Sequence, residues 1–275
     1  MISRRQFLVG LGATGAALSV PLLHGQILRT SHTRIPLWND GAPPLRLAHL
    51  SDLHYSRYTS LRHIGQAVHL AIQAQPDLIC LTGDFVDDIA PDPALYCETL
   101  RPLAQAAPTF ACLGNHDGGA WLTRIKGRPL PPDPVIELLK EAGIHVLRDH
   151  TEDLPLNHRH LLLTGVHDLW SKPIDPARAR LLPSAHRRIV LAHNPDTKDL
   201  LAKQPWDLML SGHTHGGQLR LPVVGGRLTA PVQDDRFIEG LHPWRNRHLY
   251  ITRGVGALYG VRINCPPEVS VLDLI

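Results

Sequence analysis

The sequence predicts an α/β protein in which parallel strands alternate with helices and end in polar residues. Three observations support this class. Short, continuously apolar segments alternate with longer segments whose apolar residues recur at helical spacing. Segments that are apolar on both faces are typical of the centre of a parallel sheet, because helices cover both sides of such a sheet. The apolar segments of three successive strand–helix units also end in aspartate, asparagine, histidine or glycine, at the edge of the sheet where open α/β proteins bind ligands.

The first half of the chain contains three strand–helix units in succession. Residues 45–50 form the first predicted strand, and apolar residues then recur at helical spacing from Leu61 to Ile72. The second strand covers residues 77–81, and the third covers residues 109–113. An aspartate can cap the first turn of a helix and a proline after it needs no hydrogen-bond donor, so we expect helix starts at Asp92-Pro93, Asp133-Pro134 and Asp175-Pro176.

Four polar residues that follow these strands could bind a metal ion. Asp52 and His54 follow the first strand and project to the same side of an extended chain. Asp84 follows the second strand and Asn115 the third, each after a glycine that allows a tight turn. Any one of them alone would be interpreted as a turn or a helix cap. Three successive strand ends of this kind favour a shared site.

The second half of the chain is less regular but supplies three more candidates. Its predicted strands cover residues 160–166, 188–191, 206–211, 249–252 and 269–274, with a loop rich in proline and glycine over residues 212–232. His193 follows the second of these strands, and His213 and His215 follow the third. Two histidines at this spacing could each bind a metal, or could simply form a polar turn.

Together the strand ends carry seven candidate ligands: Asp52, His54, Asp84, Asn115, His193, His213 and His215. One ion does not need seven ligands, whereas two ions that share one carboxylate do. Two ions could stabilise the attacking and the leaving oxygen in a displacement at phosphorus. They could also lower the pKa of a bridging water, so that hydroxide acts as the nucleophile. Nitrogen and oxygen donors without thiolates favour Mn, Fe or Zn in a catalytic role. His116 could protonate the leaving alkoxide.

Residues 1–23 predict an export signal. Arg4 and Arg5 precede Phe7 and a mildly apolar stretch, as in twin-arginine signals, which implies the twin-arginine export machinery as a partner. The alternative is a short apolar helix. No clear cleavage site follows, so the segment could remain as an anchor and leave the protein attached to the inner membrane or in the periplasm. We expect residues 24–44 to be a linker and residues 45–275 to form one domain.

Composition narrows the classes of partner. The net charge is +3 and the charges of both signs are interspersed, so there is no nucleic-acid-binding stripe and no protein partner is implied. Most of the 18 histidines lie in polar or amphipathic segments and are expected at the surface. Four scattered cysteines predict neither a zinc finger nor a disulfide framework, although Cys97 and Cys265 could form a bridge after export.

The polar strand ends also resemble, in order, the five blocks of the calcineurin-like metallophosphoesterases. The matching residues are Asp52-x-His54, Gly83-Asp84-x-x-Asp87, Gly114-Asn115-His116-Asp117, His193 and Gly212-His213-x-His215. Longer strings around His193, Gly212 to Gln218 and Ile251 to Gly254 are similar to an exported bacterial phosphodiesterase branch of that superfamily. The resemblance implies a four-layer αββα sandwich of two mixed β-sheets.

The resemblance further implies how the ligands divide. One metal would be held by Asp52, His54, Asp84 and His215, and the other by Asp84, Asn115, His193 and His213, with Asp84 bridging. It also implies that Asp87 orients His116. The arginine that would follow Asp87 is replaced by Asp88, so the cation that binds phosphate stays unassigned, with Arg57 and Arg253 as candidates.

We therefore expect a metal-dependent phosphoric ester hydrolase, and more specifically an exported phosphodiesterase whose catalytic residues are His116 and Asp87. Two alternatives are a hydrolase of lipid- or nucleotide-linked pyrophosphates at the membrane and a non-catalytic binding module on the same fold. The substrate would be a phosphodiester-type small molecule or lipid, which the fold alone does not identify.

Overall fold

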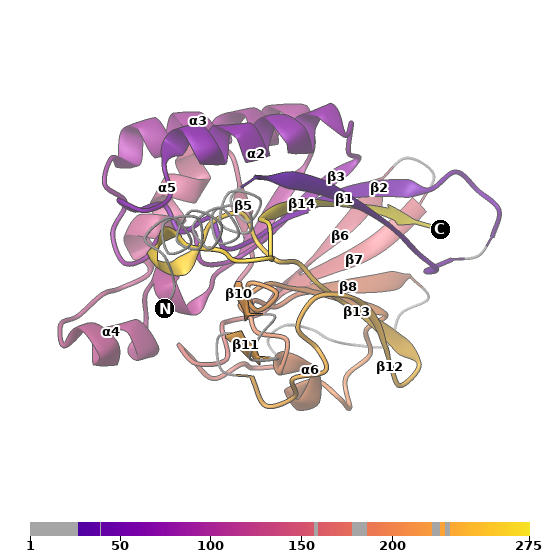
Figure 1. Ribbon diagram of the computed structural model, residues 1–275. Helices are drawn as coiled ribbons and strands as arrows, with labels where there is room; N and C mark the ends of the chain where they lie inside the picture. Colours follow the sequence, from indigo (N-terminus) through magenta and orange to yellow (C-terminus); the bar gives the residue numbers. More distant parts are fainter. Residues whose placement is uncertain (1–26, 39, 157–158, 178–185, 222–225, 229–231) are drawn as a thin grey trace, which may run out of the picture.

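Two six-stranded β-sheets packed face to face form the centre of the molecule (Figure 1). The computed structural model describes residues 27–38, 40–156, 159–177, 186–221, 226–228 and 232–275. The predicted export signal lies outside these residues. The longer helices of the described chain are α2 (Leu61–Gln73), α3 (Pro93–Ala106) and α5 (Asp133–Glu141). They cover the outer face of the first sheet. Loops and the short helix α6 (Thr197–Leu200) cover the second, so the predicted four-layer α/β architecture is confirmed.

The first sheet is mixed, with strand order β1-β14-β2-β3-β4-β5. Its strands are β1 (Arg29–Ile35), β14 (Glu268–Leu274), β2 (Leu45–Leu50), β3 (Leu78–Thr82), β4 (Thr109–Cys112) and β5 (His145–Val146). The four strands from β2 to β5 are parallel, whereas β14 is antiparallel to β2. Helices α2 and α3 connect successive parallel strands, as the three predicted strand–helix units require.

The second sheet is also mixed, with strand order β12-β13-β9-β8-β7-β6. Its strands are β12 (Gly240–Trp244), β13 (Arg247–Ile251), β9 (Leu208–Ser211), β8 (Arg187–Leu191), β7 (Arg159–Gly165) and β6 (His150–Leu156). Four parallel strands form its centre, and the antiparallel strands β12 and β6 form its edges. The predicted loop over residues 212–232 instead contains a short hairpin, β10 (Leu219–Leu221) and β11 (Gly226–Leu228).

Apolar side chains fill the space between the layers. Leu47 of the first sheet and Leu210 of the second lie in the core between the two sheets. Ile64 of α2 and Leu100 of α3 pack against the outer face of the first sheet. Burying side chains of this size stabilises a fold by about 1.5–3 kcal/mol each. The packing fixes the strands of both sheets relative to one another, and so also the loops that follow them.

Two predicted boundaries are wrong. Residues 29–35, expected to lie in a linker, form β1, which pairs in parallel with β14 over its whole length. The strand is at the edge of the sheet and most of its side chains are partly exposed, so it lacks the apolar run that marks the central strands. Asp133 does not cap α5, because the helix already begins at Asp133 after Pro132, whereas Asp92 caps α3 as expected.

The helix expected to begin at Asp175-Pro176 would continue into residues 178–185, which lie outside the described residues. Within the described part of the chain, Asp175 Oδ1 accepts a hydrogen bond from Ala177 N at 3.0 Å. All four cysteines are buried and unpaired, so the bridge between Cys97 and Cys265 does not form. Cys97 belongs to α3 and packs in the core, whereas Cys265 contacts the carbonyl of His215.

Among the helices that the structure describes, each is too short or too polar to cross a lipid bilayer.

Candidate metal centre

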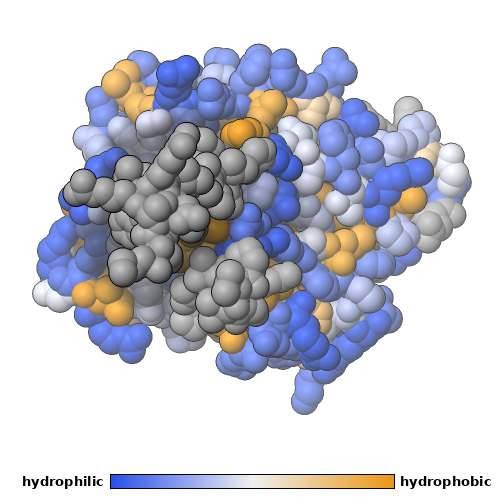
Figure 2. Space-filling model, viewed as in Figure 1, coloured by the Kyte–Doolittle hydropathy of each residue, from blue (hydrophilic) through white to orange (hydrophobic). Residues whose placement is uncertain are grey.

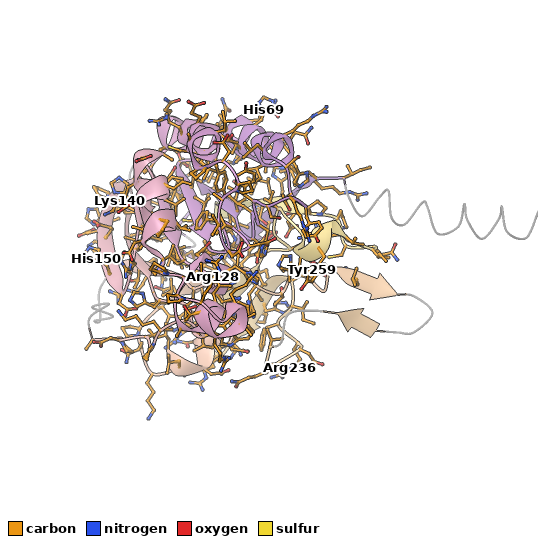
Figure 3. The ribbon with its side chains drawn as sticks, turned by 90° about the vertical axis from the view of Figure 1, so that its left-hand side faces the viewer. His69, Arg128, Lys140, His150, Arg236 and Tyr259 are labelled. Atoms are coloured by element: carbon orange, nitrogen blue, oxygen red, sulfur yellow. The ribbon has the colours of Figure 1, made fainter. Side chains whose placement is uncertain are left out.

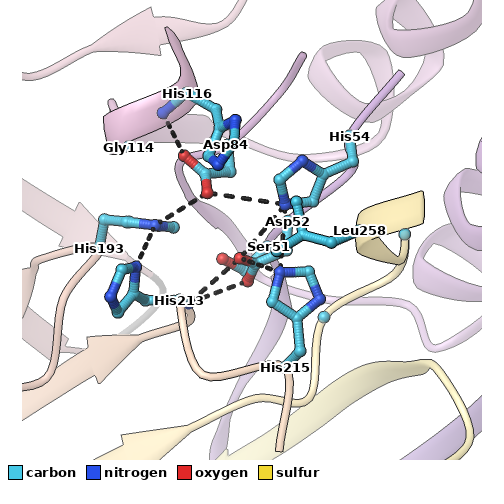
Figure 4. Close-up of polar contacts among 12 residues, drawn as sticks. Ser51, Asp52, His54, Asp84, Gly114, His116, His193, His213, His215 and Leu258 are labelled. Carbon is cyan, nitrogen blue, oxygen red and sulfur yellow. Dashed lines mark hydrogen bonds and ion pairs between the residues drawn. The ribbon is translucent and has the colours of Figure 1, made fainter. Parts of the chain in front are cut away.

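Loops that follow five strands of the two sheets meet at one edge of the sandwich (Figure 4). They follow β2, β3, β4, β8 and β9, and they carry Asp52, His54, Asp84, Asn115, His193, His213 and His215. All seven side chains are buried. The strand ends that were predicted separately from the sequence therefore lie beside one another.

Asp52, His54 and His215 form a first group whose donor atoms face a common point. The Nε2 atoms of His54 and His215 are 3.1 Å apart, and His215 Nε2 is 3.3 Å from Asp52 Oδ1. Asp84 Oδ2 lies 3.6 Å from His54 Nε2, so its carboxylate is within reach of this group (Figure 4). The arrangement suits one metal ion.

Asp84, His193 and His213 form a second group. His193 Nε2 is 3.1 Å from Asp84 Oδ2 and 3.2 Å from His213 Nδ1. Asn115 lines the same pocket, and among the described residues its buried Oδ1 atom has no hydrogen-bond partner. An amide oxygen in this state fits a metal ligand, because a buried acceptor without a partner is costly. Asp84 thus lies between two groups that could each hold one ion.

Hydrogen bonds on the far side of two imidazoles direct their lone pairs into the cluster. His193 Nδ1 is 2.7 Å from the carbonyl oxygen of Thr82, which can only accept, so Nδ1 carries the hydrogen and Nε2 carries the lone pair. That lone pair faces Asp84 Oδ2, which is also an acceptor. His54 Nδ1 is held in the same way by Asp87 Oδ1 at 2.7 Å. Acceptors that face acceptors need a cation between them, either a proton on the imidazole or a metal ion. The donor set therefore fits bound metal ions, which would replace the proton.

The charges of the cluster shift the pKa values of its members. Burial by itself would raise the pKa of Asp84, but the imidazoles of His193, His116 and His54 around it hold that pKa well below its ordinary value. Burial likewise opposes protonation of His193, yet Asp84 raises its pKa well above the usual range. The pKa of His215 is lowered by burial and by the positive charges of His54 and Arg262. Asp84 is therefore an anion that recruits positive charge.

The backbone at most of the candidate ligands is in the left-handed region. The φ angles are +53° at Asp52, +46° at His54, +53° at Asp84, +68° at His213 and +51° at His215. Residues with a Cβ atom rarely adopt this conformation, and it costs about 1–3 kcal/mol each. Such backbone persists only where the surrounding structure enforces it, and it concentrates at functional sites. The loops are therefore shaped to aim these side chains inward.

Gly212 has no space for a side chain because it packs against the first ligand group. A Cβ atom there would lie 2.0 Å from Ser51 Oγ and 2.2 Å from Asp52 Oδ2. We expect Gly212→Ala to displace the Asp52 carboxylate and to weaken metal binding about 10- to 100-fold, as measured by competition with a chelating dye.

Gly65→Ala in α2 is the matched control. Its Cβ atom would meet nothing closer than Thr99 Cγ2 at 3.8 Å. This variant should keep its metal affinity and gain about 0.5–1 kcal/mol of stability from helix propensity. Equal metal affinity in the two variants would show that the packing at Gly212 does not position Asp52.

His116 lies beside the cluster, in the short helix η1 (Asn115–Asp117). Its Nδ1 atom is 3.0 Å from the carbonyl oxygen of Asp87, which orients the ring, and its backbone N–H donates to Asp84 Oδ1 at 2.8 Å. Burial lowers the pKa of His116. The expected contact between Asp87 and His116 therefore exists, but it is made by the main chain of Asp87, whose carboxylate holds His54 instead.

Asp117 stabilises the loops but was not singled out from the sequence. Its carboxylate accepts hydrogen bonds from the backbone N–H groups of Asp84 at 2.8 Å, Phe85 at 2.7 Å and Gly114 at 2.8 Å. It thereby ties the loop after β3 to the loop after β4. Its place at the end of the string Gly114 to Asp117 was the only signal in the sequence.

Arg262 is a second residue that the sequence did not indicate. Its guanidinium is fully buried and donates to main-chain carbonyl groups, among them those of His215 and Gly256. Burial lowers the pKa of Arg262 to about 10, so the group stays charged at neutral pH. It fixes the loop after β9 against the segment before β14, and no local pattern around residue 262 could have revealed these long-range contacts.

A pocket of about 490 Å³ opens from the cluster to the surface. Trp121 and Trp170 line it: Trp121 lies 5.0 Å from the His116 ring and Trp170 lies 4.5 Å from the His213 ring, between centroids. Its other lining residues outside the cluster are largely apolar: Leu122, Ile125, Lys126, Thr214, Gln218, Leu219, Leu258 and Tyr259. Trp121 and Lys126 belong to helix α4 (Ala120–Lys126), which the sequence pattern did not predict.

Neither arginine suggested from the sequence lines this pocket. Arg253 forms ion pairs with Glu268 at 2.6 Å and Glu239 at 3.8 Å. Arg57 lies over the ring of Tyr58 at the edge of a neighbouring groove. Among the described residues, Lys126 is the one lysine or arginine that lines the pocket, and it pairs with Asp88 at 3.1 Å.

The chain was compared with known protein families and proteins. Residues 45–217 match the calcineurin-like phosphoesterase family, and residues 1–21 match the twin-arginine translocation signal. The second match confirms the predicted export signal. Such a signal directs a protein to the twin-arginine machinery for export across the membrane. The first covers the five loops of the cluster.

Three relatives and one solved structure are similar to the chain over most of its length. Phosphodiesterase YaeI of Escherichia coli is 45% identical, with 100% of both chains covered. The uncharacterized metallophosphoesterase YkuE of Bacillus subtilis is 30% identical, with 99% and 98% covered. UDP-2,3-diacylglucosamine pyrophosphatase LpxG of Chlamydia muridarum is 26% identical, with 83% of each covered. The crystal structure of TT1561 of Thermus thermophilus has a TM-score of 0.50 at 13% identity, covers 77% of this chain and 90% of its own, and supports the fold alone.

Proposed function

Because the chain belongs to the calcineurin-like phosphoesterase family, it is a metal-dependent hydrolase of phosphoric esters, and we propose that its substrates are phosphodiesters. The observation that carries this proposal is the pair of buried donor groups joined by Asp84. Whole-length similarity to a relative named a phosphodiesterase supports it. The family and the donor groups also favour a hydrolase over a non-catalytic module.

We assign the ligands to two ions as the donor atoms are grouped. Asp52, His54, Asp84 and His215 would hold one ion, and Asp84, Asn115, His193 and His213 the other. The mixture of imidazole, carboxylate and amide donors suits Mn, Fe or Zn. When bound, the two ions lower the pKa of water and stabilise negative charge on the phosphate oxygens.

The remaining roles fall to residues around the cluster. His116, oriented by the carbonyl of Asp87, would give a proton to the leaving oxygen, since an imidazole is a suitable acid near neutral pH. The Asp87 carboxylate keeps the lone pair of His54 directed into the cluster. Trp121 and Trp170 line the pocket and support the rings of His116 and His213.

Lys126 would bind the anionic part of the substrate. Its side chain lines the pocket and is 38% exposed, and its ammonium group pairs with Asp88 at 3.1 Å. We expect Lys126→Met to raise KM for a phosphodiester about three- to fivefold with little change in kcat, because an exposed charge contributes up to about 1 kcal/mol. Steady-state kinetics check this result, and Lys140→Met on α5 is the control that should leave KM unchanged. A fall in kcat with unchanged KM in Lys126→Met would contradict this role.

The place of action follows from the export signal. The twin-arginine signal directs the protein across the membrane. We propose that it works on the outer side of the inner membrane, either held there by a retained signal segment or released into the periplasm. Detection of the protein in membrane and periplasmic fractions separates the two.

The substrate class is tested by comparing three esters. The purified protein with Mn²⁺ should hydrolyse bis(p-nitrophenyl) phosphate faster than p-nitrophenyl phosphate. Faster hydrolysis of the monoester would contradict the proposal. A UDP-linked lipid pyrophosphate is the third substrate, because one relative is named a pyrophosphatase of such a compound. Preference for it would favour the pyrophosphatase alternative.

A further inference from the structure

The mouth of the metal site is surrounded by exposed apolar side chains from distant parts of the chain. Ile125 of α4 is 58% exposed and Tyr259 of the short helix η2 (Leu258–Gly260) is 77% exposed, and both line the metal pocket. Tyr58 and Ile89 are also exposed and line an adjoining groove of about 420 Å³, which shares Lys126 with the pocket. We call Tyr58, Ile89, Ile125 and Tyr259 the apolar rim.

The apolar rim is not typical of a solvent-exposed surface. Eight large apolar side chains are exposed within the described residues, and half of them belong to the rim. Figure 2 shows apolar residues scattered over one mostly hydrophilic face of the molecule. Single exposed apolar residues need no explanation, whereas a group at the mouth of a site indicates contact with a lipid or a partner.

Basic side chains lie near the rim and favour a lipid surface. Arg57, Arg124, Lys126 and Arg128 are exposed, and Arg128 and Tyr259 lie on the same face of the molecule (Figure 3). Asp88 offsets one of these charges through its contacts with Lys126 and Arg128. Apolar side chains among basic ones are typical of surfaces that insert between the anionic headgroups of a bilayer.

The N-terminal end of the described chain also lies beside the rim. Arg29 N donates to the carbonyl of Pro267 at 3.0 Å, and Pro267 lines a groove together with Tyr58 and Gly260. The residues before this point include the twin-arginine signal with its apolar stretch. A signal segment retained in the membrane would therefore join the described chain on the side of the rim.

We propose that the apolar rim docks on a bilayer with anionic headgroups and that the metal site cleaves a phosphoester carried by a membrane lipid. This inference rests on the proposed phosphodiesterase activity. The oxygen of water forms a bond to phosphorus, and the bond from phosphorus to the leaving oxygen breaks with its electron pair on that oxygen. His116 gives that oxygen its proton and regains one from the water. The products are an alcohol and a phosphomonoester, and one of the two keeps the lipid.

The test compares two phosphodiesters with the same leaving group. One is bis(p-nitrophenyl) phosphate in solution, and the other is phosphatidyl-p-nitrophenol in phosphatidylglycerol vesicles. Both release p-nitrophenolate, so the ratio of their rates reports on the lipid part alone. The full chain carries two rim substitutions, Ile125→Ser with Tyr259→Ser. A second rim pair is Tyr58→Ser with Ile89→Ser.

The matched control replaces exposed apolar residues away from the mouth. Leu95 on α3 is 51% exposed and Leu200 on α6 is 50% exposed, and the two helices lie on opposite outer layers (Figure 1). Leu95→Ser with Leu200→Ser keeps the same signal segment and loses a similar apolar area. Any contribution of that segment to vesicle binding is therefore equal in all variants.

We expect each rim pair to lower the ratio of vesicle to soluble hydrolysis about tenfold, and the control pair to change it less than twofold. An unchanged ratio in both rim pairs would overturn the proposal and indicate that something other than lipid covers the rim. Wild-type protein that hydrolyses only the soluble diester would also overturn it and leave the phosphodiesterase proposal standing. Failure to hydrolyse either diester with Mn²⁺ would overturn both.

Discussion

The variant Asp84→Asn is expected to lower kcat/KM for a phosphodiester by at least about 10³-fold, because it removes the charge that both ions would share. Asp84 lies between the two donor groups, 3.6 Å from His54 Nε2 and 3.1 Å from His193 Nε2. Asparagine keeps the oxygen that accepts from His116 N, so the loop should retain its hydrogen bond. Metal content by mass spectrometry and initial rates would be measured on the same preparation, and fewer than two ions per chain are expected.

Asp149→Asn is the matched control for this variant. Asp149 is also buried, also has a left-handed backbone with φ of +48°, and also accepts a backbone hydrogen bond, from His167 N. It lies outside both donor groups, so its substitution should leave metal content and kcat/KM within about twofold. If Asp84→Asn kept two ions and near wild-type turnover, Asp84 would not be a bridging ligand.

The variant His116→Asn is expected to bind both ions and to lose about 10²- to 10⁴-fold in kcat on a diester with an alkyl leaving group. The ring of His116 lines the pocket beside Asp84 and Asn115, and Asp87 fixes its Nδ1 atom, which leaves Nε2 to act on the substrate. A p-nitrophenolate leaving group needs little protonation, so its release should slow far less. Comparing the two leaving groups in single-turnover experiments measures the difference.

His242→Asn provides the control for the loss of an imidazole. His242 is also partly buried and also contacts a main-chain carbonyl, that of Glu239 at 2.8 Å, but it lies outside the pocket. Its substitution should not lower the rate of hydrolysis of either diester. Equal losses on both leaving groups in His116→Asn would assign this residue a structural or metal-binding role instead of proton donation.

The central part of the fold could be predicted from the sequence because its strands are buried on both faces. The prediction of residues 45–50 coincides with β2, and the other central strands differ only at their ends. Edge strands such as β1 and β6 were missed, since one of their faces is exposed and their side chains alternate irregularly between polar and apolar. Helix α4 was missed for a related reason: among its seven residues, only Leu122 is buried.

The candidate site was predictable where its chemistry lies at strand ends. Polar residues at the ends of neighbouring parallel strands have to lie at one edge of the sheet, so the sequence order alone placed Asp52, Asp84 and Asn115 together. His193 follows β8 of the second sheet, and only the packing of the two sheets brings it to the same edge. The supporting residues could not be found in that way. Arg262 acts through main-chain carbonyls that are distant in the sequence, and Lys126 reaches the pocket only because α4 packs beside it. The assignment of ligands to ions stays a prediction.

The most direct test is the metal content of the active protein, determined by mass spectrometry while a chelator removes the metal and Mn²⁺ is added back. The donor geometry predicts two transition-metal ions per chain, no phosphodiester hydrolysis without them, and recovery that follows occupancy of the second ion. Active protein that contains no transition metal, or that is fully active with one ion, would contradict a two-metal centre built around Asp84.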